Sequence, residues 1–276
     1  MQAIRKDNDS GILYRAWEAV SLEAAVVLVH GMGAHSARWD LLGTFLMNRG
    51  ISAYAIELKG FGETQTLKGH IDSIDIYYRD IKSLLGIAAA VNPGKKVYII
   101  GESMGALISF ALVLRKKDIF SGLICISPAF MSKMKIPVME YIRIFSSAVY
   151  RPRKQFSMPF TSSMCTRDEE YLKVMDEDER EHRLATSGLL VRIAGMQARV
   201  MMSKNRVTVP VLFLIAGNDK LVDPEASRKV FKRIEAEDKS IIEYPEMYHA
   251  LSVEKDREKV FEDMLAWIKK RIEVRV

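Results

Sequence analysis

One pentapeptide in this chain has the sequence and the surroundings expected of a catalytic nucleophile. GESMG, centred on Ser103, follows the apolar run VYII and precedes the apolar run ALISFALVL. A Gly-x-Ser-x-Gly sequence between a strand and a helix is typical of a nucleophile elbow, a sharp and strained turn at a helix N-terminus. The glycines remove β-carbons that would collide with the neighbouring strand and helix. The motif therefore predicts that Ser103 is a nucleophile.

A serine hydroxyl needs a base that removes its proton, and near neutral pH that base is usually a histidine. Five histidines are present, and His249 lies in the loop PEMYHALS before the C-terminal helical segment. Catalytic loops in doubly wound sheets follow the C-terminal ends of parallel strands. We therefore expect His249 to be the base, whereas the other four histidines lie in or beside loops or in a charged run.

The acid that orients this imidazole should come from the loop after the preceding strand. That loop, AGNDKLVD, offers Asp219 after a Gly-Asn turn, and Asp223 before a proline. An aspartate before proline is typical of a helix N-cap, so we assign Asp219 as the acid and keep Asp223 as the alternative. The order Ser103, Asp219, His249 is the one found in α/β-hydrolases.

Two backbone amides are candidates for the oxyanion hole of such a site. One is the N–H of Met104, directly after the nucleophile, and the other is the N–H of Met32 in the glycine loop HGMG. We expect the side chain of His30, at the start of that loop, to brace the loop rather than to react.

Short apolar runs alternate with longer amphipathic segments along most of the chain. Continuous apolar runs are expected when helices cover both faces of a sheet, so we predict an α/β fold with a mostly parallel central sheet flanked by helices. The expected strands are 12–18 (antiparallel), 25–30, 51–56, 96–100, 123–127, 209–216 and 240–244. The expected helices are 38–48, 73–90, 104–115, 226–236 and 255–273.

The alternation stops after the strand that ends at Ser127. No buried strand is recognisable between residues 128 and 208, and this segment holds nine of the chain's 15 methionines. It contains helix-like stretches at 136–150, 177–182 and 187–202. We interpret 129–207 as a helical cap inserted into a core formed by 1–128 and 208–276.

The first of these stretches has apolar residues at helical spacing, with basic residues nearby. The pattern fits two hypotheses: a helix packed over the core, or an amphipathic lid that contacts lipid aggregates or membrane surfaces. The apolar positions are Val138, Met139, Ile142, Phe145 and Val149, and the basic ones are Arg143, Arg151, Arg153 and Lys154.

The net charge of +6 and the pI of about 9.1 come mainly from the cap. Residues 130–207 carry 14 Lys and Arg against 9 Asp and Glu, so the rest of the chain is nearly neutral. No zinc-finger, P-loop or H-E-x-x-H pattern accompanies the charge, and we expect no nucleic acid, metal or cofactor. A polar N-terminus and the absence of long apolar runs predict a cytoplasmic protein, with peripheral membrane contact through the cap as an alternative. The sequence does not indicate an oligomeric state.

Six segments resemble blocks of the monoacylglycerol lipase and lysophospholipase family of α/β-hydrolases: HGMGAHSARW, GFGET, GESMGA, CISPAF, GNDKLVD and YHAL. The resemblance covers nearly all of the predicted core. It implies a nucleophile at Ser103, an acid at Asp219 and a base at His249, with oxyanion amides at Met32 and Met104.

The chain departs from this family at three places and does not align with it in the cap. GFGET lacks a histidine and a serine that the family often has, Glu102 precedes the nucleophile, and Ala106 stands where a third glycine is common. These departures leave the three catalytic positions intact. In this family the cap sets the choice of substrate.

We expect hydrolysis of monoacylglycerols or similar single-acyl-chain esters, because a methionine-rich insert can line a pocket for a variable alkyl chain. A short-chain carboxylesterase or a lysophospholipase is the alternative. A C–C bond hydrolase, a cofactor-free haloperoxidase and a non-catalytic binding protein share the fold and rank below these.

Overall fold

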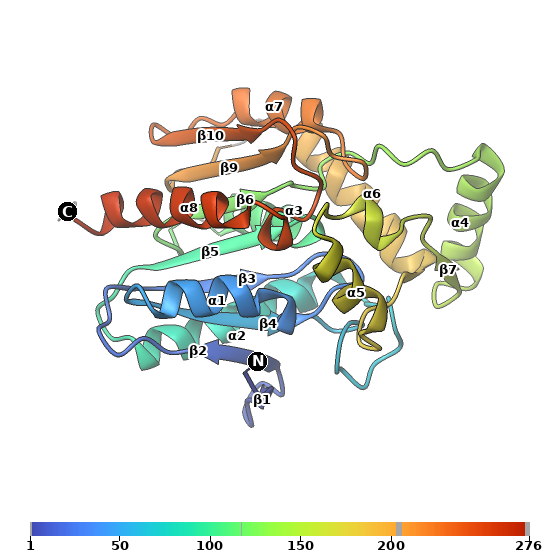
Figure 1. The fold of residues 1–276 in the computed structure, drawn as a ribbon. Helices are drawn as coiled ribbons and strands as arrows, with labels where there is room; N and C mark the ends of the chain where they lie inside the picture. Colours follow the sequence, from blue (N-terminus) through green and yellow to red (C-terminus); the bar gives the residue numbers. More distant parts are fainter. Residues whose placement is uncertain (1, 117, 203–205, 274–276) are drawn as a thin grey trace.

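An eight-stranded sheet forms the centre of the molecule in the computed structural model, which describes residues 2–116, 118–202 and 206–273 (Figure 1). The strand order is β1-β2-β4-β3-β5-β6-β9-β10. All neighbours from β4 to β10 are parallel, whereas β1 and β2 are antiparallel to their neighbours. The strands are β1 (Arg5–Lys6), β2 (Leu13–Trp17), β3 (Ala24–Val29), β4 (Ile51–Glu57), β5 (Val97–Glu102), β6 (Leu123–Ile126), β9 (Val211–Ala216) and β10 (Lys239–Tyr244).

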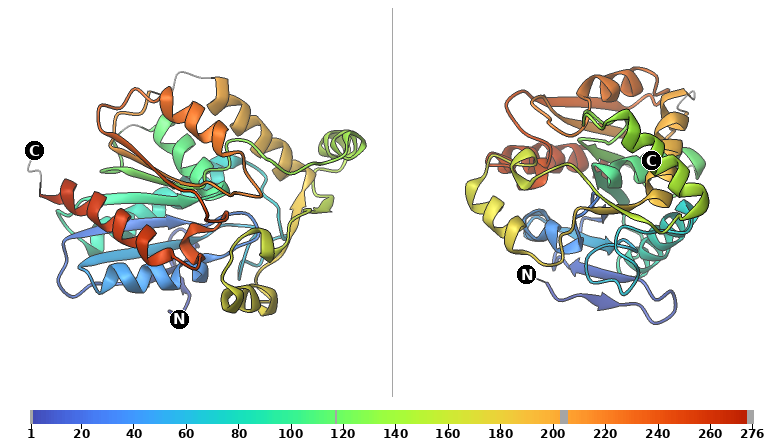
Figure 2. Two further views of the ribbon diagram at one scale, coloured as in Figure 1. Left: turned by 45° about the horizontal axis from the view of Figure 1, so that its top comes forward. Right: turned by 90° about the vertical axis from the view of Figure 1, so that its right-hand side faces the viewer.

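Helices cover both faces of this sheet (Figures 1 and 2). On one face lie α1 (Asp40–Met47) and α8 (Arg257–Ile272). On the other face lie α2 (Ile74–Val91), α3 (Met104–Arg115) and α7 (Pro224–Lys232). Strands β3, β4, β5, β6 and β9 are buried along their whole length, which explains why they are apolar without alternation. The predicted mostly parallel α/β architecture is confirmed.

The end of β9 and the start of α7 show how local sequence sets element boundaries. Asp223 caps α7: its side chain accepts a hydrogen bond from the Glu225 amide at 3.0 Å, and Pro224 is the first helical residue. A proline is favourable there because its missing N–H would have no partner in the first turn. The helix therefore begins two residues before the predicted position, and Asp223 has the predicted N-cap role.

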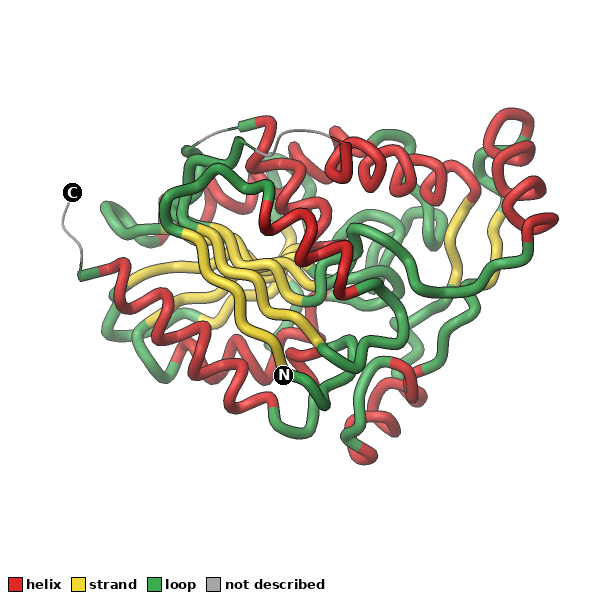
Figure 3. The backbone as a smooth tube through the Cα atoms, turned by 90° about the horizontal axis from the view of Figure 1, so that it is seen from above, coloured by secondary structure: helices red, strands yellow, loops and turns green. Residues whose placement is uncertain are grey.

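Residues 129–202, most of the segment predicted to be a cap, lie beyond the carboxyl ends of the parallel strands (Figures 1 and 3). The helices of this segment are α4 (Val138–Tyr150), α5 (Glu169–Glu177) and α6 (Ser187–Met202). It also contains a small antiparallel pair of strands, β7 (Gln155–Ser157) and β8 (Leu184–Thr186), which Figure 3 shows next to α4 and apart from the central sheet. Strands of three residues are too short for a recognisable sequence pattern.

The predicted helix at 177–182 is wrong. Helix α5 ends at Glu177, and the following residues form a turn. Asp178 and Glu181 point to the core instead, where Asp178 Oδ2 lies 3.1 Å from His35 Nε2 and Glu181 forms an ion pair with Arg38. These two tertiary contacts compete with continuation of the helix. Among the described residues, no helix is long and apolar enough to cross a bilayer.

Candidate active site

Ser103 lies on the sharp turn between β5 and α3. Its backbone has φ 58° and ψ −119°, a strained conformation for a residue with a β-carbon. Gly105 permits the close packing of this turn, because a β-carbon there would lie 2.1 Å from the carbonyl oxygen of Val29. The GESMG sequence therefore forms the predicted elbow, with the serine at the N-terminus of α3.

Asp219 and His249 meet although they are 30 residues apart. His249 Nδ1 lies 2.7 Å from Asp219 Oδ2, and both side chains are buried. The other carboxylate oxygen of Asp219 accepts hydrogen bonds from the amides of Leu221 (2.8 Å) and Val222 (2.9 Å). Because the carboxylate is held on both oxygens, it fixes the imidazole with Nδ1 as a donor and leaves Nε2 to accept a proton.

The surroundings of His249 set its basicity. Burial by itself lowers the pKa of this imidazole, but the Asp219 carboxylate and its hydrogen bond, together with the charge of Glu102, raise it above the ordinary value. A raised pKa makes the imidazole a stronger proton acceptor.

A cavity of about 510 Å³ brings the predicted residues together beneath the cap. Ser103 and His249 line it, and so do Met32 and Met104, whose amides are the predicted oxyanion donors. Asp219 lies behind His249 rather than in the cavity wall. Gly31 allows the close approach of the two loops, since a β-carbon at this position would lie 3.1 Å from Ser103 Cβ.

His30 has the bracing role expected of it. Its Nε2 accepts a hydrogen bond from the Leu58 amide at 3.1 Å, and its Nδ1 lies 2.8 Å from the carbonyl oxygen of Gly31. Among the described residues, no group of three or more His, Cys, Asp or Glu side chains is arranged to hold a metal ion.

The cavity has an apolar side and a polar side. The apolar side is formed by α4, α6 and the methionines around them: Met134, Ile136, Tyr141, Ile144, Phe145, Met158, Leu190, Val191, Ile193 and Ala194. The polar side includes Arg38, Asp176, Asp178, Glu181, His182 and Arg183. The sequence did not indicate this polar side, because Arg38 of the core and residues 176–183 of the cap come together only in the folded chain.

His35, which lies behind that polar side, is a neutral hydrogen-bond partner. Burial and the nearby charge of Arg180 lower the pKa of His35 to about 3. The pKa of Asp178 is also lowered, mainly by its hydrogen bonds from Arg180. At neutral pH this corner therefore contains a charged carboxylate, a charged guanidinium and an uncharged imidazole.

Comparison with known proteins identifies the family. The family model described as "Serine aminopeptidase, S33", a hydrolase family, matches residues 21–256. The chain belongs to this family. It is therefore a serine hydrolase.

Curated relatives and solved structures agree with the fold. The chain is 24% identical over 264 residues to a protein named monoacylglycerol lipase from Mycolicibacterium smegmatis, covering 93% of this chain and 92% of that one. It is 25% identical over 252 residues to an uncharacterized abhydrolase domain-containing protein from Dictyostelium discoideum, of which it spans 27%. The crystal structure of the Paleococcus ferrophilus monoacylglycerol lipase superposes with a TM-score of 0.86 at 24% identity, covering 94% of this chain and 99% of that chain. The predicted α/β-hydrolase fold is confirmed.

Proposed function

We propose that this serine hydrolase cleaves carboxylic esters with a single acyl chain, monoacylglycerols foremost, to a fatty acid and an alcohol. The observation that carries the proposal is the cavity, in which Ser103 and His249 lie beside a wall of aliphatic, aromatic and methionine side chains. Such a wall favours an alkyl chain, and a volume of about 510 Å³ is within the usual range for sites that enclose one small ligand. The relatives named monoacylglycerol lipases support the same substrate class.

In the proposed mechanism, Ser103 Oγ attacks the ester carbonyl while His249 Nε2 takes its proton. The amides of Met32 and Met104 stabilise the resulting oxyanion. Collapse of this intermediate breaks the bond to the alcohol, which receives the proton from His249, and leaves an acyl group on Ser103. Water then gives a proton to His249 and attacks the acyl group, releasing the fatty acid and restoring the serine. Asp219 holds the imidazole throughout and stabilises its charged form.

The two sides of the cavity suit the two parts of such an ester. The acyl chain lies along the apolar side between α4 and α6. The hydroxyl groups of the alcohol lie toward the polar side, where Arg38 and Glu181 offer donors and acceptors.

A substrate panel tests the proposal directly. We expect kcat/KM for p-nitrophenyl esters and monoacylglycerols to rise with acyl length, by up to about 0.8 kcal/mol for each buried methylene, until the cavity is filled. Lysophospholipids and aminoacyl anilides in the same panel test the other head groups and the peptidase activity that the family description names. A steady decline beyond butyrate would contradict the lipid substrate but leave the esterase assignment intact.

Variants test the proposed roles. Ser103→Ala should fold and lose at least about a thousandfold in kcat, and Asp219→Asn should lose about ten thousandfold through the wrong histidine tautomer. Asp223→Asn is the matched control, because it lies in the same loop but caps α7; its kcat should change little. Reversal of the two aspartate effects would show that the acid is Asp223.

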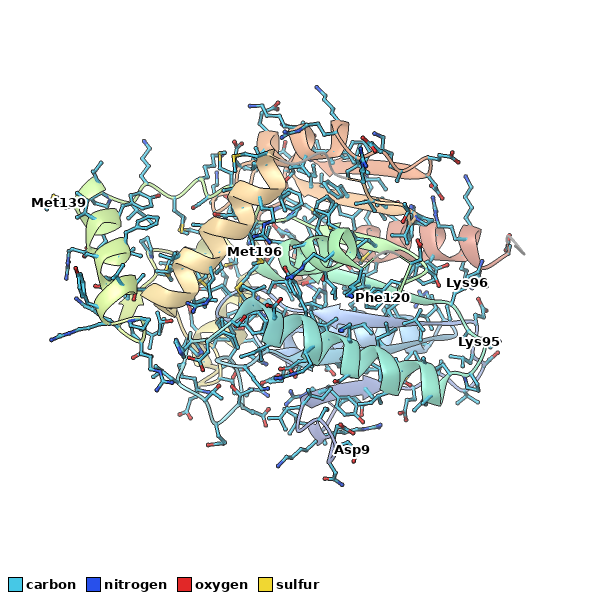
Figure 4. All side chains as sticks on the ribbon, turned by 180° about the vertical axis from the view of Figure 1, so that it is seen from behind. Asp9, Lys95, Lys96, Phe120, Met139 and Met196 are labelled. Carbon is cyan, nitrogen blue, oxygen red and sulfur yellow. The ribbon has the colours of Figure 1, made fainter. Side chains whose placement is uncertain are left out.

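We further propose that α4 contacts lipid surfaces through its exposed apolar face. Val138 (74% exposed), Met139 (67%), Ile142 (54%) and Val149 (73%) project away from the body of the molecule, so they do not pack over the core. Figure 4 shows Met139 at the end of the molecule opposite Lys95 and Lys96. Only Ile144 of this helix is buried.

Two observations favour a lipid aggregate as the occupant of this face. The face is continuous with the cavity, because Tyr141 and Phe145 are both exposed and line the cavity wall. Arg143 of α4 and Arg153 and Lys154 after it are exposed basic groups that would meet anionic head groups.

Vesicle co-sedimentation measures this contact. We expect binding to phosphatidylcholine vesicles that increases when phosphatidylglycerol is added, and a marked loss when Val138, Ile142 and Val149 are all replaced by serine. Val20→Ser is the control, since Val20 is fully exposed on a core loop away from the cap. Equal binding to both vesicle types would argue against an electrostatic contribution. Unchanged binding of the triple variant would argue against a lipid contact through α4.

A further inference from the structure

Glu102 is a buried carboxylate that the mechanism above does not use. It is the last residue of β5 and is 5% exposed. Its Oε1 accepts a hydrogen bond from the Ser252 amide at 3.0 Å, and its Oε2 accepts one from the Ser252 hydroxyl at 2.9 Å. Ser252 is itself 1% exposed. Both oxygens are therefore held by a single residue that lies 150 positions away in the sequence.

Two other buried carboxylates of the core have cationic partners. Glu57 Oε2 lies 3.6 Å from a guanidinium nitrogen of Arg15, and Glu254 Oε1 lies 2.8 Å from Arg167 Nε. In the described part of the chain, no lysine or arginine lies within ion-pair distance of Glu102. A buried carboxylate without a counter-ion is costly, so its position calls for a role other than stability.

The position of Glu102 in the chain indicates that role. Glu102 is bonded directly to Ser103, whereas Ser252 lies in the 3-10 turn Leu251–Val253, just after His249. The contact between Glu102 and Ser252 thus joins the segment that carries the proposed nucleophile to the segment that carries the proposed base. The distance between these two reacting groups depends on such a connection, and small displacements are costly in acyl transfer.

We propose that Glu102 is a positioning residue of this hydrolase, which ties the His249 loop to the nucleophile elbow through its hydrogen bonds with Ser252. The negative charge of Glu102 also raises the pKa of His249. The inference rests on the Ser103–His249 pair as the catalytic machinery, and it is independent of which ester is the substrate.

Few charged or titratable groups lie around Glu102. They are His249, Arg38 with its partner Glu181, and the side chains of Cys165 and Tyr171 in the cap. Burial raises the pKa values of Cys165 and Tyr171 to about 12, so both are neutral in the working range. Burial also raises the pKa of Glu102, against the opposing effects of the Ser252 hydrogen bonds and of His249. Among these groups, His249 is the one whose ordinary pKa lies near neutral pH, and its surroundings raise it.

The test is the pH profile of Glu102→Gln, which keeps the size of the side chain and removes its charge. We expect kcat to fall by about tenfold or more, with a smaller change in KM. Loss of the negative charge lowers the pKa of His249, so the acid limb of kcat/KM should move to lower pH, by roughly half a unit to one unit. An unmoved acid limb would overturn the proposal, whether kcat is unchanged or falls together with the melting temperature.

Glu57→Gln is the matched control. Glu57 is also a buried carboxylate at the end of a sheet strand, and it accepts hydrogen bonds from the amides of Ser36 (2.7 Å) and Glu63 (2.6 Å). It lies away from His249, so its replacement should lower the melting temperature without moving the acid limb. A shift of the acid limb as large as that of Glu102→Gln would show that any buried carboxylate has this effect. It would contradict a specific role of Glu102.

Glu102→Asp distinguishes the effect of the negative charge from the effect of the hydrogen bonds to Ser252. It also tests the proposal if Glu102→Gln does not fold. The shorter side chain keeps the charge but cannot hold both groups of Ser252, so kcat should fall while the acid limb stays at the wild-type pH. A wild-type kcat in this variant would contradict the claim that the contact of Glu102 with Ser252 positions His249. Labelling of Ser103 by a fluorophosphonate across pH reports the same acid limb without an ester, so a failure of the substrate proposal would be distinguished from a failure of this one.

Discussion

The two parts of the cap that enclose the cavity are held in different ways. The α5 part, residues 160–183, is joined to the core by polar contacts: Glu181 with Arg38, Asp178 with His35, Asp168 with Arg257, Arg167 with Glu254 and Asp256, and the Cys165 carbonyl with the Ala250 amide. The α4 part, residues 136–150, packs mainly on α6 of the cap itself. Its ion pair, Arg143 with Glu140, lies within the helix.

This difference suggests that the two parts of the cap have different roles. Eight of the nine acidic residues of the cap lie in 168–181, where Glu181 pairs with Arg38 of the core and Asp168 pairs with Arg257. The α5 part thereby becomes a fixed wall next to the His249 loop. The α4 part keeps an exposed apolar face at the mouth of the cavity, which suits a side through which an apolar substrate enters.

The largest expected effect is the loss of a buried ion pair in the α5 part. Arg38→Met leaves the mostly buried carboxylate of Glu181 unpaired and should lower the free energy of unfolding by about 3–5 kcal/mol in urea denaturation. Arg143→Met, which breaks the exposed ion pair of α4, should change it by less than about 1 kcal/mol. Equal losses of unfolding free energy in the two variants would show that the two parts of the cap are held equally strongly by ion pairs.

A smaller effect on stability is expected at the N-cap residues of α5 and α4. Asp168 caps α5 by accepting hydrogen bonds from the amides of Glu170 and Tyr171, and it also binds Arg257 at 2.6 Å. Asp168→Ala should therefore cost about 1–2 kcal/mol. In α4 the capping residue is Pro137, which makes no side-chain cap, so Pro137→Ala should cost clearly less. Thermal unfolding of the two variants measures these losses, and the loss for Asp168→Ala should be the larger.

The contribution of Asp178 in the α5 part to stability should depend on pH. Because the pKa of Asp178 is lowered in the folded state, mainly by Arg180, its contribution to stability is present above its ordinary pKa and is lost as pH falls below it. The melting-temperature difference between wild type and Asp178→Asn should thus be constant from about pH 8 to about pH 5, and shrink below about pH 4. A difference that grows on acidification would contradict this sign.

The smallest expected effect is at the exposed face of α4. Replacing Val138, Ile142 or Val149 by serine should each change the free energy of unfolding by about 0.5 kcal/mol or less, because these side chains are exposed in the folded state as well. Ile144→Ala is the contrasting variant in the same helix, and it should cost about 2 kcal/mol or more because Ile144 is buried. Comparable losses at all four positions would indicate that the α4 face is covered in solution.

Sequence patterns were most reliable where neighbouring residues decide the structure. The bounds of α3 (Met104–Arg115) and of α6 (Ser187–Met202) match the predicted ones, since each helix is an uninterrupted apolar or amphipathic stretch. The run 177–182 has similar helical character, yet Asp178 and Glu181 bind core residues that lie far away in the sequence. Local propensity is a weak preference, and tertiary ion pairs overrode it at this point.

By itself, the sequence determined the order of the main strands and helices of the core, the strained elbow at Ser103 and the loop positions of Asp219 and His249, because these depend on glycines, apolar runs and turn residues within a few positions. Only the tertiary structure decided that Asp219 rather than Asp223 reaches His249. It also decided that Glu102 holds Ser252, and that the apolar face of α4 turns away from the core. Such contacts join residues as many as 150 positions apart, and their geometry exists only once the whole sheet and the cap are assembled.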